Sequence, residues 1–251
     1  MTTADPADPP AVSVVVPVHN EADNIRPLVA EIAAALEGAG EAYEMVYVDD
    51  GSRDATPDRL RRARGDHPAL RVVRHAGAAG QSAAVRSGVK AARGRFVATL
   101  DGDGQNDPAD IPALLGRLRG AHDPDALMVA GWRATRHDSA MRRAASRIAN
   151  GLRRRLLGDD TPDTGCGLKV MTRDAFLDLP GFDHMHRFLP ALMVRRGGSV
   201  ESVAVNHRPR REGTSKYGIA KRAAAGVVDL AGVLWLARRG KCAAVRPTEE
   251  A

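Results

Sequence analysis

Two carboxylates and an amide occupy alternate positions in the stretch Asp101-Gly102-Asp103-Gly104-Gln105. This stretch directly follows the apolar run from Phe96 to Leu100, which is typical of a buried strand. Such side chains can point into one opening, and oxygen-only ligands suit a hard cation such as Mg²⁺ or Mn²⁺. Taken alone, the same residues are more typical of a plain Asp-Gly turn. An EF-hand is excluded, because its Gly and Glu positions are Asn106 and Pro112 here.

A second polar group, Asp49-Asp50-Gly51-Ser52, follows the short run from Met45 to Val48. A carboxylate there could accept an N–H from a nucleobase, and a turn capped by Asp and Ser is the alternative. The stretch from Gly77 to Ser82 resembles a phosphate loop only loosely, because it lacks the Gly-Lys-Ser/Thr ending of a P-loop. The helix expected after Gly80 could still favour an anion at its N-terminus.

The second half of the chain carries two basic stretches. The loop from His207 to Tyr217 offers guanidinium, ammonium and hydroxyl groups that suit a phosphate or pyrophosphate, although a solubilising surface loop explains it equally well. The stretch from Trp132 to Leu157 holds eight arginines and one acid, and we expect a helix in it with about half of the arginines on a solvated face. His186 and Cys166 are interpreted as structural residues, and zinc ligands at the usual spacing are lacking.

An open sheet could bring these groups together. Sequence patterns typical of strands alternate with patterns typical of helices along the first half of the chain, and further strands and helices are expected in the second half. The strands are expected at 12–16, 45–48, 70–73, 96–100, 126–130 and 199–205, with a loop that runs into a further strand within 163–171. The helices are expected at 24–36, 54–64, 81–92, from 108, at 184–195 and at 223–236. This alternation with short connections predicts parallel βαβ units in an α/β sheet. The polar clusters after the strands should then share one edge, where such sheets bind ligands.

Composition narrows the class of protein further. The chain has 251 residues, of which 43% are hydrophobic and 27% charged, which excludes a fully disordered protein. Its net charge of +6 favours phosphate-bearing partners such as nucleotides, nucleic acid or an anionic membrane. Two cysteines are too few for a disulfide framework, so a reduced, cytoplasmic setting is expected. The stretch from Met1 to Pro10 is unlike a signal peptide, and no run has the roughly 20 apolar residues of a membrane span.

Taken in order, the motifs resemble those of the family 2 glycosyltransferases. The resemblance lies in V-S-V-V-V-P-V-H-N-E, Y-V-D-D-G-S-R-D and A-R-G-R-F-V-A-T-L-D-G-D-G-Q-N-D-P. Within the family, the chain is most similar to the polyprenol-phosphate sugar transferases, the dolichol-phosphate mannosyltransferase-like group. The segments D-T-G-C-G-L-K-V-M, M-H-R-F-L-P-A-L and H-R-P-R-R-E-G-T-S-K-Y-G resemble its bacterial branch. The likeness covers about residues 12–239.

This resemblance implies a GT-A fold, which is a Rossmann-like, open, mostly parallel α/β sheet flanked by helices. It implies a domain over 11–222, with a nucleotide-sugar half at 11–131 and an acceptor half at 132–222. The tails 1–10 and 240–251 are expected to be flexible. The helix at 223–239 has apolar residues at helical spacing, with Trp235 near one end and basic residues on both flanks. It could lie in a membrane interface or pack on the core.

The resemblance also implies roles for individual residues. The nucleotide-sugar pocket would include Pro17, His19, Glu21, Asp50, Gly80 and Asp101. The metal, Mg²⁺ or Mn²⁺, would be bound by Asp101, Asp103 and Gln105. The basic loop would close over the diphosphate and the acceptor phosphate through Arg208, Arg211, Ser215 and Lys216. The catalytic residues would be Asp101, Asp103, Arg211 and Lys216.

The implied activity is the metal-dependent, inverting transfer of a sugar from a UDP- or GDP-linked donor to a polyprenyl phosphate. We expect it at the inner face of the cell membrane, with peripheral membrane contact and no nucleic-acid partner. A phosphate monoester has a second pKa of about 6, so it is mostly dianionic at neutral pH and can attack without a strong base. A transferase of the same fold with a soluble or polysaccharide acceptor would need a base, for which Asp163 is the candidate. A non-catalytic protein that binds nucleotide sugars or nucleic acid is the third alternative, which the few aromatic residues disfavour.

Overall fold

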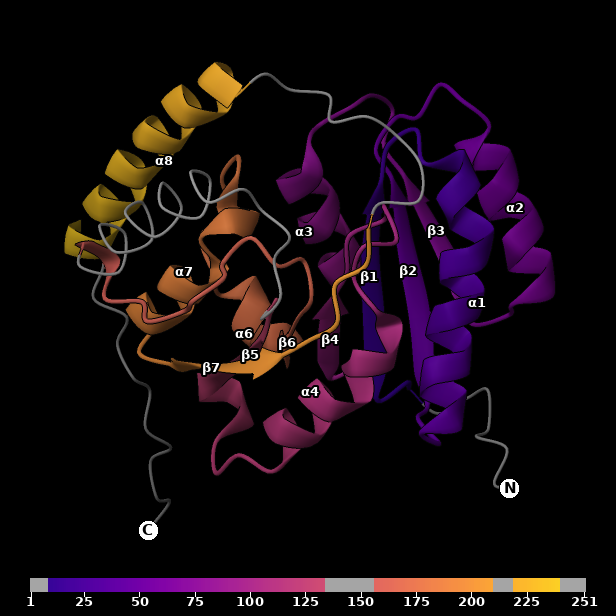
Figure 1. Ribbon diagram of the computed structural model, residues 1–251, viewed down its shortest axis with the longest axis horizontal. Helices are drawn as coiled ribbons and strands as arrows, with labels where there is room; N and C mark the ends of the chain where they lie inside the picture. Colours follow the sequence, from indigo (N-terminus) through magenta and orange to yellow (C-terminus); the bar gives the residue numbers. More distant parts are fainter. Residues whose placement is uncertain (1–8, 134–155, 210–218, 240–251) are drawn as a thin grey trace, which may run out of the picture.

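A computed structural model describes residues 9–133, 156–209 and 219–239 of the chain. Seven strands in these segments form one sheet in the order β3-β2-β1-β4-β6-β5-β7 (Figure 1). Their bounds are β1 (Val12–Val18), β2 (Tyr43–Asp49), β3 (Leu70–Arg74), β4 (Phe96–Thr99), β5 (Leu127–Trp132), β6 (Lys169–Thr172) and β7 (Ser199–Ala204).

The sheet is open and mostly parallel, as the alternation of strands and helices predicted. Strands β1 to β4 pair in parallel with one another, and β5 pairs in parallel with β7. The exception is β6, which runs antiparallel to both β4 and β5. Strand order reverses beside β1, which has β2 on one side and β4 on the other. A crevice at such a reversal is where open α/β sheets bind ligands.

Helices cover both faces of the sheet (Figure 1). The α-helices are α1 (Ala22–Gly38), α2 (Thr56–Asp66), α3 (Gln81–Ala91), α4 (Ile111–Arg119), α6 (Arg173–Leu177), α7 (Leu189–Arg195) and α8 (Ile219–Arg239). Three short 3₁₀ helices in the described segments are η1 (Pro108–Asp110), η2 (Pro124–Ala126) and η3 (Met185–Arg187).

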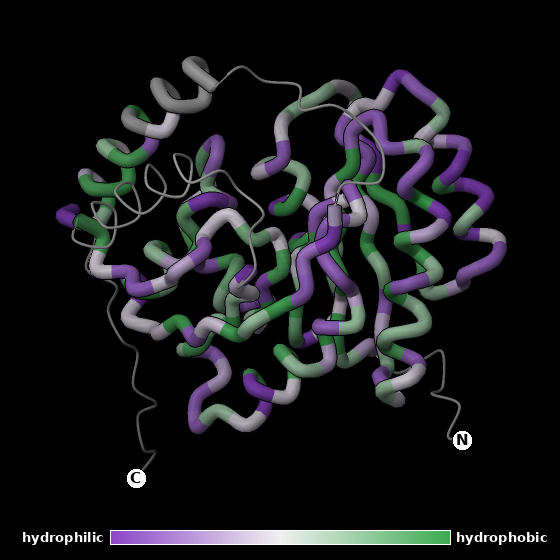
Figure 2. The backbone as a smooth tube through the Cα atoms, viewed as in Figure 1, coloured by the Kyte–Doolittle hydropathy of each residue, from purple (hydrophilic) through white to green (hydrophobic). Residues whose placement is uncertain are grey.

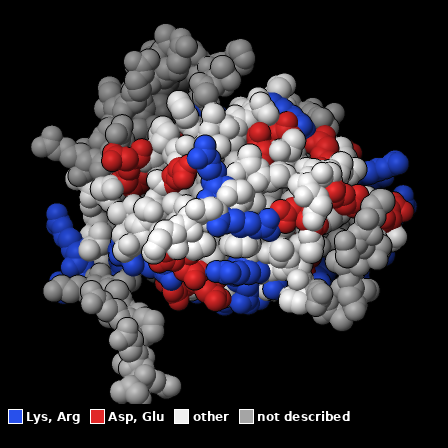
Figure 3. Space-filling view, turned by 90° about the horizontal axis from the view of Figure 1, so that it is seen from below, with Lys and Arg blue, Asp and Glu red and all other residues white. Residues whose placement is uncertain are grey.

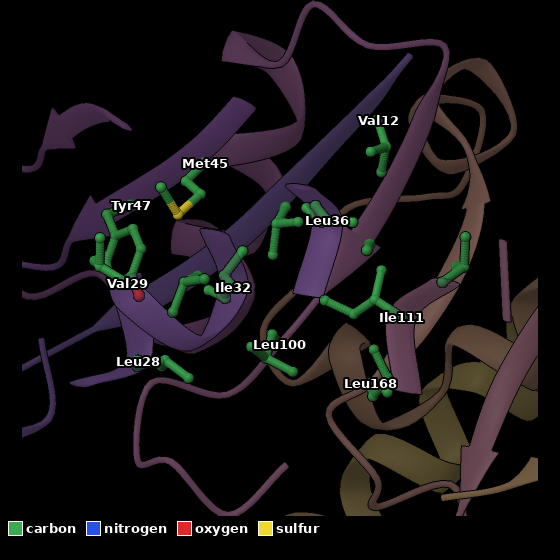
Figure 4. Packing of buried hydrophobic residues seen from close by; sticks show 14 of the residues in the cluster. Val12, Leu28, Val29, Ile32, Leu36, Met45, Tyr47, Leu100, Ile111 and Leu168 are labelled. Atoms are coloured by element: carbon green, nitrogen blue, oxygen red, sulfur yellow. The ribbon is translucent and has the colours of Figure 1, made fainter. Parts of the chain in front are cut away.

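The two faces carry two separate hydrophobic cores because side chains alternate along each strand. On β1, Val14 and Val16 belong to the core beneath α1, α2 and α4, whereas Val15 belongs to the core beneath α3 and α7. Figure 4 shows the first core, where Leu28, Val29, Ile32 and Leu36 of α1 gather with Met45 and Tyr47 of β2, and with Ile111 of α4. Burial on both faces explains why β1 and β2 read as continuous apolar runs.

Two helices expected as single elements are divided. The segment expected to be helical over 184–195 forms η3 and then α7, with Pro190 in the first turn of α7. The helix expected from Pro108 forms η1 and then α4, with Pro112 in its first turn. Proline lacks an N–H and clashes with the backbone inside a helix, but it fits in the first turn. Each of these α-helices therefore begins so that its proline lies in the first turn. The helix expected within 132–157 lies almost wholly outside the described residues.

Helix α8 packs on the second core by one side only (Figure 1). Val233 is 2% exposed, Asp229 Oδ2 lies 2.8 Å from His184 Nδ1, and Arg195 Nε donates to the Leu236 carbonyl at 3.0 Å. Its later turns are largely hydrophobic (Figure 2), yet Val228 is 71% exposed and Trp235 60% exposed. Apolar side chains therefore remain exposed on the outer side of this helix. None of the described helices combines the length and apolar character needed to cross a membrane.

His186 joins the second core to α3 and is structural, as the sequence suggested. Its Nδ1 lies 2.7 Å from the Ser82 hydroxyl oxygen. Burial, reinforced by the nearby positive charge of Arg187, lowers the pKa of His186 to about 3. The imidazole is therefore neutral in the folded protein at ordinary pH.

This burial makes stability depend on pH. In the unfolded chain, histidine binds a proton with a pKa near 6.5, whereas the folded His186 stays neutral at that pH. The neutral His186 therefore contributes its full stabilisation above pH 6.5, and this stabilisation is lost as the pH falls. We expect His186 to cost about 1–2 kcal/mol in the free energy of unfolding between pH 7.5 and pH 5. Denaturant unfolding of wild type and His186→Gln at both pH values checks this. The same pH dependence in both proteins would contradict it.

Candidate active site

Polar residues that follow β1 and β2 interlock at the carboxyl ends of these strands, as predicted. The Asn20 amide N–H donates to the Ser52 hydroxyl at 2.9 Å, and the Asn20 side-chain oxygen accepts from the Arg53 amide at 2.8 Å. His19 Nδ1 lies 2.7 Å from the carbonyl oxygen of Asp50, to which it donates. The two turns therefore support each other and form one rim of the sheet edge.

A cavity of about 470 Å³ opens at this rim, a size typical of small-molecule sites. Its walls come from the ends of three neighbouring strands and include the residues His19, Asn20, Gly51, Ser52, Arg53, Arg74, Ala76, Gly77 and Ala78. His19 lines this cavity, and its expected role in nucleotide binding stays a prediction. Pro17 and Glu21 do not line this cavity. Pro17 lies in β1 opposite Val48 of β2, and the Glu21 carboxylate accepts a hydrogen bond from Asn24 Nδ2 at 2.7 Å.

Asp50 turns its carboxylate toward the protein. Oδ1 accepts from the Ala79 amide and lies within 2.7 Å of His75 Nδ1, while Oδ2 accepts from the Gly80 amide at 2.8 Å. Burial alone would raise the pKa of Asp50, but these donors outweigh it and hold the pKa below its usual range. Three of about four acceptor positions on the carboxylate are therefore occupied, and the expected contact with a base remains a prediction.

Helix α3 begins directly after Gly80, as the sequence predicted. Gly80 has a φ of +92°, a conformation that glycine adopts without strain. Gly80 was expected to take part in binding the nucleotide sugar, and in this structure its amide donates to Asp50. In this structure the anion held at the start of α3 is the protein's own carboxylate, which is the interaction that a helix N-terminus favours.

Asp101 lies past the end of β4, beside the point where strand order reverses. Its Oδ1 accepts a hydrogen bond of 2.8 Å from Gln81 Nε2. A side chain at position 167 would collide with the Asp101 carboxyl group, so only glycine fits there. Burial and the charge of Asp103 raise the pKa of Asp101, against the opposing effect of Lys169 and Arg133.

The donor set fits a hard divalent cation. Asp103 also forms the local turn that was the simpler interpretation, because its Oδ1 accepts from the Gln105 amide at 3.1 Å. Within the described residues, no three His, Cys, Asp or Glu side chains are grouped closely enough to hold an ion by themselves. Asp101, Asp103 and the Gln105 amide oxygen could thus supply part of a coordination shell, which substrate phosphates and water would complete.

The basic loop begins alongside this aspartate motif. Asn106 and His207 form an isolated antiparallel bridge, and the Arg208 amide donates to the Gln105 carbonyl at 2.9 Å. The Arg208 guanidinium pairs with Glu31 and with Asp107, each at 2.6 Å. Arg208 therefore anchors the loop in this structure, whereas it was expected to bind phosphate. The other expected phosphate ligands, Arg211, Ser215 and Lys216, lie outside the described residues.

A largely buried ion pair lies near Asp101. Arg133 Nε and Nη2 donate to the two carboxylate oxygens of Asp163 at 2.6 and 2.9 Å, and Asp163 is only 4% exposed. Asp163 is therefore poorly placed to serve as the general base of a soluble-acceptor transferase. Lys169 is 2% exposed and donates through Nζ to the Cys166 carbonyl. Cys166 is buried, as its structural interpretation requires.

Sequence reasoning missed Gln81 and Lys169. Lys169 had a signal, because a lone lysine among the apolar residues of a central strand must find compensating charge when it is buried. The signal for Gln81 was weaker: it is the first residue of a helix that begins at the edge of the sheet where ligands usually bind.

Comparison with known proteins now decides the family. The model of the family described as glycosyl transferase family 2 matches residues 13–179. The chain belongs to glycosyl transferase family 2. It is 39% identical to a dodecaprenyl-phosphate galacturonate synthase from Rhizobium johnstonii over 94% of this chain and 70% of that protein. It is 36% identical to an undecaprenyl-phosphate 4-deoxy-4-formamido-L-arabinose transferase from Edwardsiella ictaluri, over 84% of this chain and 64% of that protein.

Solved structures of other glycosyltransferases share the GT-A fold, which confirms the expected architecture. A mannosyltransferase from Pyrobaculum calidifontis, in complex with GDP-Man and Mn²⁺, superposes with a TM-score of 0.67 at 23% identity, over 94% of this chain and 67% of that one. A glucosyl-3-phosphoglycerate synthase from Mycobacterium tuberculosis, in complex with Mn²⁺ and UDP-glucose, also gives 0.67 at 19% identity, over 92% and 80%. At these identities the likeness concerns the fold.

The Arg133–Asp163 pair predicts how an Asp163→Asn variant of this glycosyltransferase behaves. Removing one partner of a buried ion pair leaves the other charge uncompensated, which costs on the order of 3–5 kcal/mol. We expect that loss in the free energy of unfolding, with turnover of the folded fraction largely kept. A general base would behave differently, because its loss lowers turnover by about 10²–10⁴-fold. Unfolding curves and activity per folded molecule distinguish the two, and a fully stable, inactive variant would contradict the structural role.

Proposed function

We propose that this glycosyltransferase moves a sugar from a UDP- or GDP-linked donor to a polyprenyl phosphate. The proposal takes its acceptor class from relatives that are 36–39% identical and whose names state polyprenyl phosphates. The chain spans 70% of the first relative and 64% of the second, so the activity of those whole proteins supports this proposal without deciding it.

One observation in the structure carries the proposal. The aspartate motif after β4, the cavity at the ends of β1 to β3 and the start of the basic loop all meet at one edge of the sheet. A donor nucleoside in the cavity would direct its diphosphate toward Asp101 and Asp103. The bridge from Asn106 to His207 would deliver the basic loop to the same place.

The chain's residues would mainly stabilise the leaving group. An oxygen of the acceptor phosphate attacks the anomeric carbon while the bond from that carbon to the diphosphate breaks, so the configuration inverts. Asp101, Asp103 and Gln105 would hold Mg²⁺ or Mn²⁺, which when bound neutralises charge on the diphosphate. Arg211 and Lys216 of the basic loop would add positive charge. The dianionic acceptor needs no strong base, in keeping with an Asp163 that is held by Arg133.

The acceptor implies a membrane surface, and we propose that α8 contacts it. Val228 and Trp235 are exposed on the outer side of the helix, while Val233 holds the inner side on the core. Arg238 and Arg239 follow in its last turn. An exposed apolar strip ending in tryptophan and arginine suits the boundary between headgroups and acyl chains. Such contact would be peripheral and would place the enzyme at the inner face of the membrane.

A nucleic-acid partner is less well supported. On the face shown in Figure 3, basic side chains alternate with acidic ones and do not gather into one patch. Ion pairs such as Arg117–Glu201 and Arg196–Asp178 use basic charge within the protein. A nucleic-acid-binding domain usually collects its basic residues on one face or along one helix.

A transfer assay tests the activity. Purified protein is incubated with undecaprenyl phosphate, Mn²⁺ or Mg²⁺ and a panel of labelled UDP- and GDP-sugars, and label is extracted into organic solvent. We expect labelled lipid from one donor, with loss on metal removal and at least a hundredfold loss in Asp103→Ala, because the leaving-group charge is then uncompensated. Asp58→Asn, at an exposed position that does not line the cavity, serves as the control. A folded, fully active Asp103→Ala enzyme would contradict the metal assignment.

Vesicle binding tests the role of α8. Burying an aromatic side chain contributes about 1.5–3 kcal/mol, so Trp235→Ser should weaken binding to anionic vesicles roughly tenfold or more. The variant should keep its thermal stability, because Trp235 is 60% exposed. Trp132→Ser, also at an exposed tryptophan but outside α8, is the matched control. Equal vesicle affinity of Trp235→Ser and wild type would exclude this contact.

A further inference from the structure

Asp50 lies at the centre of a chain of hydrogen bonds that links the cavity wall to the aspartate motif. Next to it, Gly51 adopts a φ of +67°, and a Cβ there would collide with the backbone of Gly77 and Ala78. The turn after β2 therefore packs backbone to backbone against the segment 77–80. Gly77 and Ala78 of this segment line the cavity, and Ala79 and Gly80 donate their amides to Asp50.

The same carboxylate is tied to the body of α3. His75 Nδ1 lies 2.7 Å from Asp50 Oδ1, and His75 Nε2 lies 2.9 Å from the Ser87 hydroxyl oxygen. His75 therefore bridges the Asp50 carboxylate and the Ser87 hydroxyl through its two ring nitrogens. Asp50 is thus connected both to the loop before α3 and, through His75, to the middle of that helix.

Gln81 carries the connection to the aspartate motif. It is the first residue of α3, directly after Gly80, and its Nε2 donates to Asp101 Oδ1 at 2.8 Å. The hydrogen bond from the Gly80 amide to Asp50 therefore also helps to fix the backbone position from which the Gln81 side chain extends. The path from Asp50 to Asp101 runs through hydrogen bonds and one covalent step along the chain.

We propose that Asp50 and Gln81 are positioning residues: Asp50 holds the loop 77–80, and Gln81, the residue of α3 that directly follows this loop, sets the orientation of the Asp101 carboxylate. This inference rests on the proposed function, since Asp101 is taken to act on the donor. This network of hydrogen bonds connects the cavity wall at Gly77 and Ala78 to the carboxylate of Asp101. A nucleoside that seats against Gly77 and Ala78 would steady Asp101 as well.

The inference separates two roles for Asp50. A residue that reads a nucleobase sets which donor is used, and its loss changes the preference between UDP- and GDP-sugars. A positioning residue acts through Asp101, so its loss lowers kcat and raises the metal concentration required while leaving that preference unchanged. Gln81 does not line the cavity, and its loss should then produce the same effects as the loss of Asp50.

A double-mutant cycle measures this coupling. We expect Asp50→Asn and Gln81→Leu each to lower kcat roughly tenfold and to raise the Mn²⁺ concentration for half-maximal activity by a similar factor, as for loss of a hydrogen bond to a charged group. The double variant should be no worse than the more severe single variant, because both changes break one path. Multiplying effects, or an altered donor preference in Asp50→Asn alone, would overturn the inference.

Amide hydrogen exchange tests the structural link without turnover. Asp50→Asn should speed exchange at the Ala79 and Gly80 amides by at least about tenfold, since they lose their charged acceptor. Asp58→Asn should leave these amides unchanged. An inactive wild-type protein would count against the proposed function alone. Unchanged exchange at Ala79 and Gly80 in Asp50→Asn would overturn the positioning role whether or not the protein transfers sugar.

Discussion

The half-buried carboxylate of Asp101, just past the end of β4, is the constraint on which this site depends. Burial raises the pKa of Asp101 and so opposes its ionised form, and the neighbouring charge of Asp103 adds to this effect. The compensating groups come from three different elements: Gln81 from α3, Lys169 from β6 and Arg133 from the end of β5. Because β6 is antiparallel to β4, its first residue, Lys169, pairs with Thr99 at the carboxyl end of β4 and so lies close to Asp101.

These groups only partly offset the effects that raise the pKa of Asp101. Arg133 is already paired with Asp163, and Lys169 donates to the Cys166 carbonyl, so neither cation neutralises Asp101 outright. The pKa of Asp101 consequently remains raised. A divalent cation at Asp101 and Asp103 would supply the missing positive charge. The protein thus holds two acids together at a cost, which a metal with its diphosphate would relieve.

Sequence patterns predicted the part of the fold that is local. The β-branched run of β1, and the turn residues after β2 and β4, are enough to place polar clusters at one edge of a parallel sheet. The family and the GT-A architecture also followed from the ordered motifs. The sequence could not supply the reversed direction of β6, because antiparallel pairing with β4 depends on contacts between segments far apart in the chain.

The partners of charged residues were the least predictable feature. Arg208 lies in a basic loop, yet its guanidinium pairs with Glu31, which is 177 positions earlier. Asp50 has the residue type to read a base, yet its oxygens accept from Ala79, Gly80 and His75. A sequence states which charge a residue carries, while its partner is set by the packing of distant elements. Several of the predicted residues do lie together at one edge of the sheet, and their roles there stay predictions.

The central claim is that Asp101 marks the place where metal and donor diphosphate meet. Isothermal titration of UDP and GDP into wild type and Asp101→Asn, with and without Mn²⁺, tests it most directly. The account predicts that wild type binds one of the nucleotides only with Mn²⁺, and that Asp101→Asn, folded by circular dichroism, loses this binding. Equal nucleotide affinity in the two proteins, or binding that ignores Mn²⁺, would contradict the account.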